Sequence, residues 1–287
     1  MENILEETRF IMKKYGIRAN KSLGQNFLIN SEVVESIVNS SEITEEDMVI
    51  EIGPGLGTLT KYLLEKAGKV LCIELDTRMI EILEDRFSIY DNFELINEDV
   101  LKVDLNKLIQ ENLSTGLKTA KIVANLPYYI TTPIIMKLLE ENLNIESITV
   151  MIQKEVADRL IETPGGKETG AITYSVYYYC ESEKIMEVPN SSFIPEPEVT
   201  SEVIKMTLRK EPAVKLDNPK VMFMIIKSAF MQRRKTLLNA LTNTKVFLSK
   251  NEGLEILKKL NLAENVRAEN LTIEDFANIA SLIQGGK

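Results

Sequence analysis

The chain has 287 residues, 44% of them hydrophobic, which is enough for one substantial core and a smaller second one. It contains no histidine, which excludes Ser-His-Asp hydrolysis, His-Glu-x-x-His zinc sites and histidine general bases. Lysine and arginine number 34 against 43 aspartate and glutamate residues, so the net charge of −9 argues against a nucleic-acid partner unless basic residues gather locally.

The sequence shows no membrane span, no secretory signal and no cysteine motif. No apolar run approaches the roughly 20 residues that span a bilayer. The segment 1–14 carries acidic residues and lacks the order of a secretory signal. We therefore expect a cytoplasmic protein with no membrane partner. Cys72 and Cys180 lack Cys-x-x-Cys spacing, so we expect two buried cysteines, no disulfide framework and no metal site.

Short apolar runs alternate with helix-like stretches through the first two-thirds of the chain. The runs that predict buried strands are 48–52, 69–73, 93–96, 121–124 and 147–152. Helical patterns lie between them at 58–66, 77–87 and 133–141. This alternation predicts a parallel sheet with helices on both faces, which is a Rossmann-like α/β fold.

Three glycines, Gly53, Gly55 and Gly57, follow the first predicted strand where the next helix begins. Glycines there let the backbone approach a ligand that Cβ atoms would hold away. The Gly-x-Gly-x-Gly spacing differs from the Gly-x-Gly-x-x-Gly of dinucleotide sites, whose third glycine packs the helix near the pyrophosphate. The segment therefore predicts a nucleotide-cofactor turn for a cofactor without phosphate, and the alternative is a tight structural turn.

Acidic residues end the next two predicted strands. Glu74 closes the second, where doubly wound folds place an acid on ribose hydroxyls. Asp99 follows the third, where its carboxylate could accept a hydrogen bond from an adenine amine. Taken singly, each acid is more often a helix cap or a surface charge.

The tetrapeptide Asn125-Leu126-Pro127-Tyr128 follows the fourth predicted strand. The lone pair of an adenine N6 amine is delocalised into the ring, and two acceptors that hold both amine hydrogens can draw the nitrogen toward tetrahedral geometry. The Asn125 side-chain oxygen and the Leu126 carbonyl could be these acceptors. Pro127 fixes φ and removes a donor. Tyr128 offers a ring on which the base can stack.

This chemistry needs no strong base, because the amine can lose its proton to water after the positive charge forms. That requirement agrees with the absence of histidine. The competing interpretation is an ordinary Asn-x-Pro turn at the end of a strand.

The character of the chain changes in its last third. Turn formers at 163–170 precede a tyrosine-rich run, 171–180, which predicts another strand whose tyrosines mostly pack in the core. A further strand is predicted at 199–208. The helical patterns that follow are 220–230, 233–241, 251–260 and 273–283. We therefore expect an α/β domain over 1–210 and a small all-α domain over 211–287.

Basic residues gather in two places. One cluster lies near the start, at Lys13, Lys14, Arg18 and Lys21. The other is the run of Arg233, Arg234 and Lys235. Runs of this kind are usually solvated faces and need support from elsewhere.

The segments Asn125–Tyr128, Glu51–Thr60 and Gln25–Leu28 together resemble the ribosomal RNA adenine N6-dimethyltransferases. Phe193–Ser201 and Ala229–Asn239 look like the branch that modifies a pair of adjacent adenines near the 3′ end of small-subunit ribosomal RNA. The resemblance extends in consistent order from about residue 21 to 239. One departure is the threonine at position 200, where the family more often has aspartate.

The resemblance implies an S-adenosylmethionine-dependent methyltransferase acting as a monomer on 16S rRNA within the small ribosomal subunit or its precursor. The implied catalytic residues are Asn125, Leu126, Pro127, Tyr128 and Phe193, and Phe193 would complete a clamp on the flipped base beside Tyr128. The implied cofactor residues are Asn26, Leu28, Gly53, Gly55, Glu74, Asp99 and Asn125. The implied RNA-binding residues are Arg233, Arg234 and Lys235. The resemblance also implies that 1–210 is the catalytic domain with an N-terminal lid segment and that 211–287 is a helical domain that contacts RNA and the ribosome.

Three other functions stay open. A 23S rRNA adenine N6-dimethyltransferase would share the cofactor turn and a similar tetrapeptide, although Leu126 and the segment 232–237 favour the small-subunit branch. A ribosome assembly factor could use the same fold as a docking module. An NAD-dependent dehydrogenase would share the glycine turn and Glu74, but it leaves Asn125 to Tyr128 unexplained.

Overall fold

The computed structural model describes residues 3–20 and 24–285. It divides into two compact units, of which the first comprises Met1–Ala157 and Ser182–Leu208 and the second Asp158–Glu181 and Arg209–Lys287. Within the described residues, no helix has both the length and the apolar character needed to cross a membrane.

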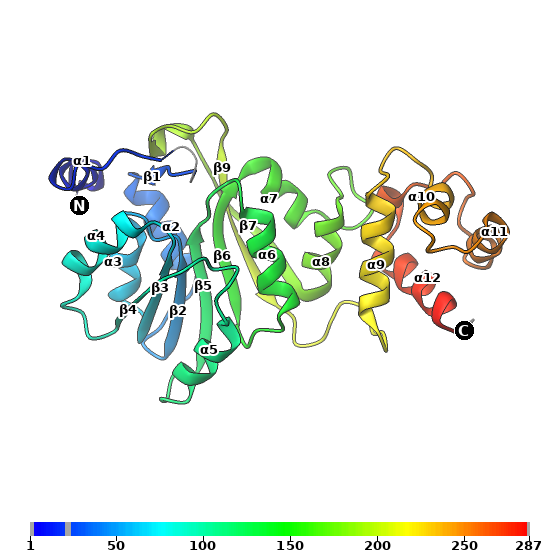
Figure 1. Cartoon of the computed structure of the whole chain (residues 1–287), viewed down its shortest axis with the longest axis horizontal. Helices are drawn as coiled ribbons and strands as arrows, with labels where there is room; N and C mark the ends of the chain where they lie inside the picture. The colour runs from blue at the N-terminus through cyan, green and yellow to red at the C-terminus, as the bar shows by residue number, and fades with distance from the viewer. Residues whose placement is uncertain (1–2, 21–23, 286–287) are drawn as a thin grey trace. The chain divides into compact units, whose positions relative to one another are not determined.

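A seven-stranded sheet in the order β4-β3-β2-β5-β6-β9-β7 organises the first unit (Figure 1). Strands β2 to β6 run parallel to their neighbours, and β9 pairs with β6 in the antiparallel direction. The strands are β2 (Asp47–Ile52), β3 (Lys69–Glu74), β4 (Phe93–Asn97), β5 (Thr119–Asn125), β6 (Ser147–Gln153), β7 (Cys180–Val188) and β9 (Ser201–Leu208). The predicted parallel sheet is confirmed.

Helices of the first unit cover both faces of this sheet. The helices are α1 (Ile4–Lys14), α2 (Ser31–Ser40), α3 (Thr58–Leu64), α4 (Thr77–Phe87), α5 (Leu105–Leu113) and α6 (Thr131–Glu140). Side chains of α1 to α4 share one hydrophobic cluster with alternate residues of the strands, such as Val49 and Val70. Helix α5 contacts β2 and β5, whose other alternate residues, Ile50 and Ile122, are buried outside that cluster.

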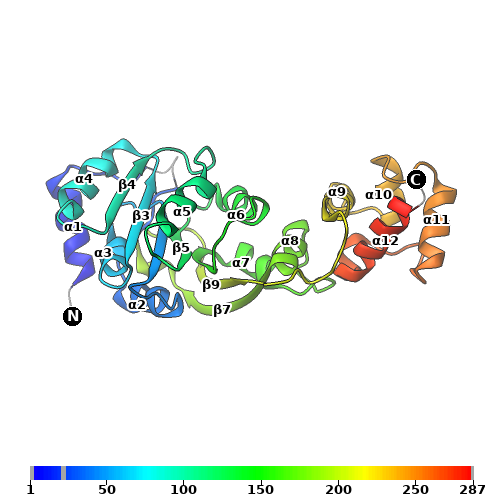
Figure 2. The ribbon, with the colours of Figure 1, turned by 90° about the horizontal axis from the view of Figure 1, so that it is seen from below.

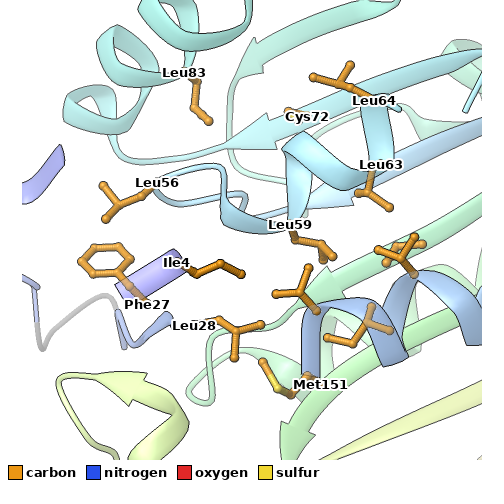
Figure 3. Close-up of a cluster of buried hydrophobic side chains, with 14 of the residues drawn as sticks. Ile4, Phe27, Leu28, Leu56, Leu59, Leu63, Leu64, Cys72, Leu83 and Met151 are labelled. Carbon is orange, nitrogen blue, oxygen red and sulfur yellow. The ribbon is translucent and has the colours of Figure 1, made fainter. Parts of the chain in front are cut away.

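A small two-stranded sheet adds to this cluster. Strand β1 (Phe27–Leu28) pairs in the antiparallel direction with β8 (Phe193–Ile194), with Leu28 opposite Phe193. Figure 3 shows the side chains of Phe27 and Leu28 pointing into the cluster that also holds Leu56 and Met151. Apolar burial therefore ties the N-terminal segment to the central sheet.

The second unit is helical, which confirms the predicted helical C-terminal part. Its helices include α8 (Ala171–Tyr179), α9 (Pro219–Phe230), α10 (Leu237–Asn243), α11 (Lys250–Lys259) and α12 (Ile273–Gly285), and Figure 2 shows α9 to α12 grouped together. Helix α7 (Lys154–Ile161) leads into this unit from the sheet.

The predicted strand over 171–180 is wrong, because residues 171–179 form α8 and only Cys180 belongs to a strand, as the first residue of β7. Tyr174 and Tyr178, four residues apart, lie on one face of a helix and pack into the core of the second unit. Tyr174 meets Phe276 edge to face at 5.0 Å, and its hydroxyl donates to the Leu271 carbonyl at 2.7 Å. This packing overrides the strand preference of tyrosine. Residues 158–181 belong to the second unit together with 209–287. The division of the chain therefore differs from the single boundary expected at residue 210.

Candidate functional site

A cavity opens at the carboxyl ends of β2, β3 and β5, where the strand order reverses. The chain builds β3 and β4 on one side of β2 and then returns to build β5 on the other side. Ligands of doubly wound sheets bind in the crevice that this reversal creates. The cavity is lined by Gly24–Leu28, by residues 51–56, 58–59, 73–75, 98–100 and 125–130, and by Ile134.

The glycine turn lies on one wall of this cavity. Gly53 and Gly55 adopt φ of 69° and 58°, a region that favours glycine. A Cβ on Gly53 would come within 3.8 Å of the Pro127 ring, and one on Gly55 within 3.5 Å of the Phe27 ring. The missing side chains thus leave room between the turn and the opposite walls. Gly57 serves packing instead, because a Cβ there would overlap Phe87.

Glu74 ends β3 with its carboxylate buried in the cavity wall. Its Oε2 accepts from the Gly55 backbone N–H at 3.1 Å, and its Oε1 accepts from the Asp76 N–H at 2.8 Å. Burial raises the pKa of this carboxyl, and these backbone donors oppose that rise. Each carboxylate oxygen has a further acceptor position. The group can therefore accept hydrogen bonds from ligand hydroxyls.

Asp99 lines the cavity beyond the end of β4. It is half-buried, and its Oδ1 accepts from the Leu101 backbone N–H at 3.0 Å. The second carboxylate oxygen and the spare acceptor positions can serve a ligand amine. Tyr129, which sequence analysis overlooked, also lines the cavity, and the charges of Asp99 and Glu74 add to the effect of burial in raising the pKa of its phenol.

Asn125 closes β5 beside the N-terminal segment. Its Nδ2 donates to the Asn26 carbonyl at 3.3 Å, which leaves Oδ1 available as an acceptor. The Leu126 backbone N–H donates to the Met151 carbonyl at 3.1 Å. The Pro127 carbonyl accepts from Ile130 N–H at 3.2 Å at the start of α6. These bonds fix the backbone of the tetrapeptide at the cavity.

Tyr128 is held at its far end. Its hydroxyl shares a 2.5 Å hydrogen bond with Ser201 Oγ on β9, and burial raises the pKa of its phenol. A ring restrained at the hydroxyl keeps its orientation, so the face that lines the cavity is prepared for a stacked ligand.

The segment 24–28 forms the wall opposite the glycine turn. Asn26 and Leu28, both predicted cofactor residues, line the cavity. Gln25 holds this wall through its amide, because Nε2 donates to Asp76 Oδ2 at 2.8 Å and Oε1 accepts from the Asn20 N–H at 2.8 Å. The sequence gives no signal for the contact with Asp76, since this partner lies 51 residues further along the chain.

The structure does not bring all of the predicted site residues to the cavity. Phe193 is only 1% exposed, pairs with Leu28 and lies in the hydrophobic core. It does not line the cavity. Its clamp on a base stays a prediction.

The predicted RNA-binding residues belong to the second unit. Arg233, Arg234 and Lys235 are all exposed. Arg233 Nε pairs with Glu269 Oε2 at 3.1 Å, whereas Arg234 and Lys235 form no ion pair with any described residue. Lys21, from the N-terminal basic cluster, lies outside the described residues.

Glu51 is a cavity residue that sequence analysis did not single out. It is 2% exposed within β2, and its carboxyl accepts from Thr60 Oγ1 at 2.6 Å. Burial raises its pKa to about 7. The Cys72 thiol donates to the same carboxyl at 3.5 Å, and both cysteines are buried and free, as predicted. A lone acid inside an apolar strand was the signal that could have identified Glu51.

Comparison with known proteins gives consistent matches. A family model described as "Ribosomal RNA adenine dimethylase" matches residues 16–285. The "Ribosomal RNA small subunit methyltransferase A" of Alkaliphilus metalliredigens is 50% identical over 273 residues, covering 95% of this chain and 94% of that protein. The protein of the same name from Bacillus pumilus is 47% identical, covering 96% and 95% of the two chains.

Solved structures show the same fold. A dimethyladenosine transferase from Plasmodium falciparum superposes with a TM-score of 0.74 at 27% identity, covering 90% of this chain and 98% of that one. The 23S rRNA methyltransferase ErmE gives a TM-score of 0.68 at 22% identity, covering 90% and 100%.

Proposed function

The chain belongs to the ribosomal RNA adenine dimethylase family, and from this membership we propose that it dimethylates the N6 amines of two adjacent adenines near the 3′ end of 16S rRNA in the small ribosomal subunit. Curated relatives that cover nearly the whole chain act, by their name, on the small subunit, which favours this substrate over 23S rRNA. We further propose that the enzyme acts as a monomer in the cytoplasm, on the assembled subunit or its precursor.

The cavity residues fit S-adenosylmethionine, which supplies an electrophilic methyl group when bound. Glu74 would accept from the ribose hydroxyls and Asp99 from the adenine amine, with the acceptor positions left free by their backbone donors. Gly53 and Gly55 give the backbone close access to the cofactor. Asn26 and Leu28 would cover it from the N-terminal segment.

The single observation that carries the activity is that Asn125 and Leu126 both line this cavity. The Asn125 Oδ1 and the Leu126 carbonyl would hold both hydrogens of the target amine, so that its lone pair turns toward the donor. Pro127 would keep the Leu126 carbonyl in place and Tyr128 would stack on the adenine. We propose Phe193 as a second clamp only in the RNA-bound protein, because its ring must leave the core to reach a base.

The function is tested by offering the purified protein unmethylated small subunits and unmethylated large subunits together with labelled S-adenosylmethionine. We expect label as dimethyladenosine in 16S rRNA. Label confined to 23S rRNA would support the large-subunit alternative. Tight binding to small-subunit precursors without any label would support the assembly factor.

Glu74→Ala is expected to weaken S-adenosylmethionine binding by one to two orders of magnitude, about 1.5–3 kcal/mol, because a charge-assisted hydrogen bond to the ribose is lost. Calorimetric titration measures this affinity. Glu74→Gln keeps one acceptor for a backbone N–H and should lose less. An affinity unchanged in both variants removes Glu74 from the cofactor site.

Replacing Arg233, Arg234 and Lys235 together by alanine should weaken binding to the small subunit and flatten the plot of log affinity against log salt. Since Arg233 already pairs with Glu269, we expect the slope to fall by about 2 rather than by the full value for three phosphate contacts. Cofactor affinity should stay unchanged. Alanine at the exposed Lys250, Lys258 and Lys259 removes equal charge and is the control. If the plots of log affinity against log salt have equal slopes for the two variants, Arg233, Arg234 and Lys235 do not contact phosphates.

A further inference from the structure

Helix α1 carries a basic face that the proposed catalytic site does not use. Arg9, Phe10 and Lys13 are exposed on this helix, and Arg18 is exposed just beyond its end. We call these four residues the α1 face. Arg9, Lys13 and Arg18 form no ion pair with any described residue, whereas the neighbouring Lys14 is paired with Asp85 at 2.7 Å. Among the described residues, the α1 face therefore holds three cations without an ion-pair partner, and the one exposed acid on the same side of the helix is Glu6, in its first turn.

Phe10 lies between these cations with 66% of its surface exposed. The opposite side of α1 is well packed, because Ile4, Thr8 and Ile11 are buried. The Phe10 ring is therefore not packed against the described residues, and it does not contribute the stabilisation that burial of a phenylalanine provides. An aromatic ring flanked by free cations is the combination with which proteins bind single-stranded nucleic acid, stacking on a base and pairing with phosphates.

Specific contacts hold α1 next to the cofactor cavity. Arg86 of α4, with a side chain only 14% exposed, pairs with Glu7 of α1 and also donates to the carbonyl of Leu56 in the cavity wall. The chain that leaves α1 continues into Gly24–Leu28, which forms another wall. Figure 1 shows α1 beside α4 and near β1. These contacts place α1 next to elements that line the cavity, where it can meet RNA on either side of a bound adenine.

We propose that the α1 face binds RNA flanking the target adenines, with Arg9, Lys13 and Arg18 on phosphates and Phe10 stacked on an unpaired base. The inference rests on the proposed RNA substrate. A local cluster of cations is what a chain of net charge −9 needs to bind an anionic partner, and the α1 face supplies Arg9, Lys13 and Arg18 without ion-pair partners among the described residues. Helix α1 lies outside residues 16–285, which match the family model, and Arg18 lies inside them.

The test compares two variants that each lose two positive charges. Arg9→Ala/Lys13→Ala alters the α1 face, and Lys66→Ala/Lys118→Ala alters exposed lysines outside it. Binding to unmethylated small subunits is measured over a range of salt concentrations. We expect the first variant to bind about tenfold more weakly at low salt, with a slope smaller by about 1.5, and the control to resemble the wild type. S-adenosylmethionine affinity should be equal in all three proteins.

Phe10→Leu separates stacking from apolar contact. It keeps an apolar side chain but removes the ring, and we expect subunit binding to weaken about fivefold or more with an unchanged salt slope. Full binding by Phe10→Leu overturns the stacking contact, and equal slopes for the two double variants overturn the phosphate contacts. If the wild type is a dimer and Phe10→Leu is a monomer, the α1 face binds a second copy of the chain, and the proposal is overturned. In each of these outcomes the wild type still methylates 16S rRNA. If the proposed function itself is wrong, the wild type places no methyl label on 16S rRNA, so the two failures can be told apart.

Discussion

Asn125→Ala is expected to lower the rate of methyl transfer by about a hundredfold or more, at least about 2.7 kcal/mol, while binding of the small subunit changes only severalfold. The Asn125 Oδ1 is proposed to accept from the N6 amine, and this hydrogen bond strengthens as positive charge develops on the nitrogen. Its loss therefore falls on the transfer step rather than on ground-state binding. Single-turnover kinetics at saturating subunit concentration measure the effect.

The assay needs saturating S-adenosylmethionine, because Asn125 also donates to the Asn26 carbonyl in the wall that covers the cofactor. Asn125→Asp is the matched variant, since it keeps an acceptor oxygen and loses the N–H donor. Faster transfer by the aspartate variant than by the alanine variant supports the acceptor role. Near-normal transfer by Asn125→Ala would remove Asn125 from catalysis.

The same variant separates methylation from docking in cells. Tyr128 and the exposed basic segments stay intact in Asn125→Ala, so the protein can still capture the subunit. If the inactive variant supports normal subunit maturation, methylation is the dispensable activity. If maturation fails although the subunit is bound, the methyl groups themselves are needed.

Local patterns were sufficient to predict the five parallel strands of the sheet, but not β7. Strands β2 to β6 follow from short apolar runs separated by helical periods. Helix α4 spans the predicted residues, and it begins there because Asp76, two residues after β3, caps it. The 171–180 run failed for a physical reason. Its tyrosines suit either a strand or a helix locally, and only contacts with Phe276 and Phe223, far along the chain, favour the helix.

The candidate site was predictable where function depends on the residue that ends a strand. Glu74, Asp99 and Asn125 all reach the cavity because parallel strands end at one edge. Contacts between distant segments were not predictable, such as the bond of Tyr128 with Ser201 or that of Arg86 with Glu7. These contacts depend on how loops cross the edge of the sheet, which no local pattern encodes.

In each of the two basic clusters, the structure pairs one cation with an acid. In the N-terminal cluster, Lys14 is committed to Asp85, while Lys13 and Arg18 are free. In the C-terminal run, Arg233 is committed to Glu269. A charge count therefore overstates the number of phosphates that each cluster can bind, and the salt slopes predicted above are correspondingly small.

Glu51→Gln is expected to raise the free energy of unfolding in a pH-dependent manner. The burial of Glu51 raises its pKa from 4.5 to about 7 in the folded protein, so the folded state holds this proton more tightly than the unfolded chain does. As pH rises between these two values, the unfolded chain releases the proton first, and the wild type loses stability until about pH 7. Glutamine keeps an acceptor for Thr60 and has no proton to lose.

The advantage of Glu51→Gln over the wild type should therefore grow by about 2–3 kcal/mol between pH 5 and pH 8, with most of the growth below pH 7. Urea unfolding at several pH values measures it, and Glu35→Gln on the exposed side of α2 is the control. An advantage that does not change with pH would mean that Glu51 stays ionised in the fold. A confirmed dependence means that Glu51 is mainly a neutral acid in the cavity lining below about pH 7, so that Glu74 is the buried carboxylate proposed to face the cofactor ribose.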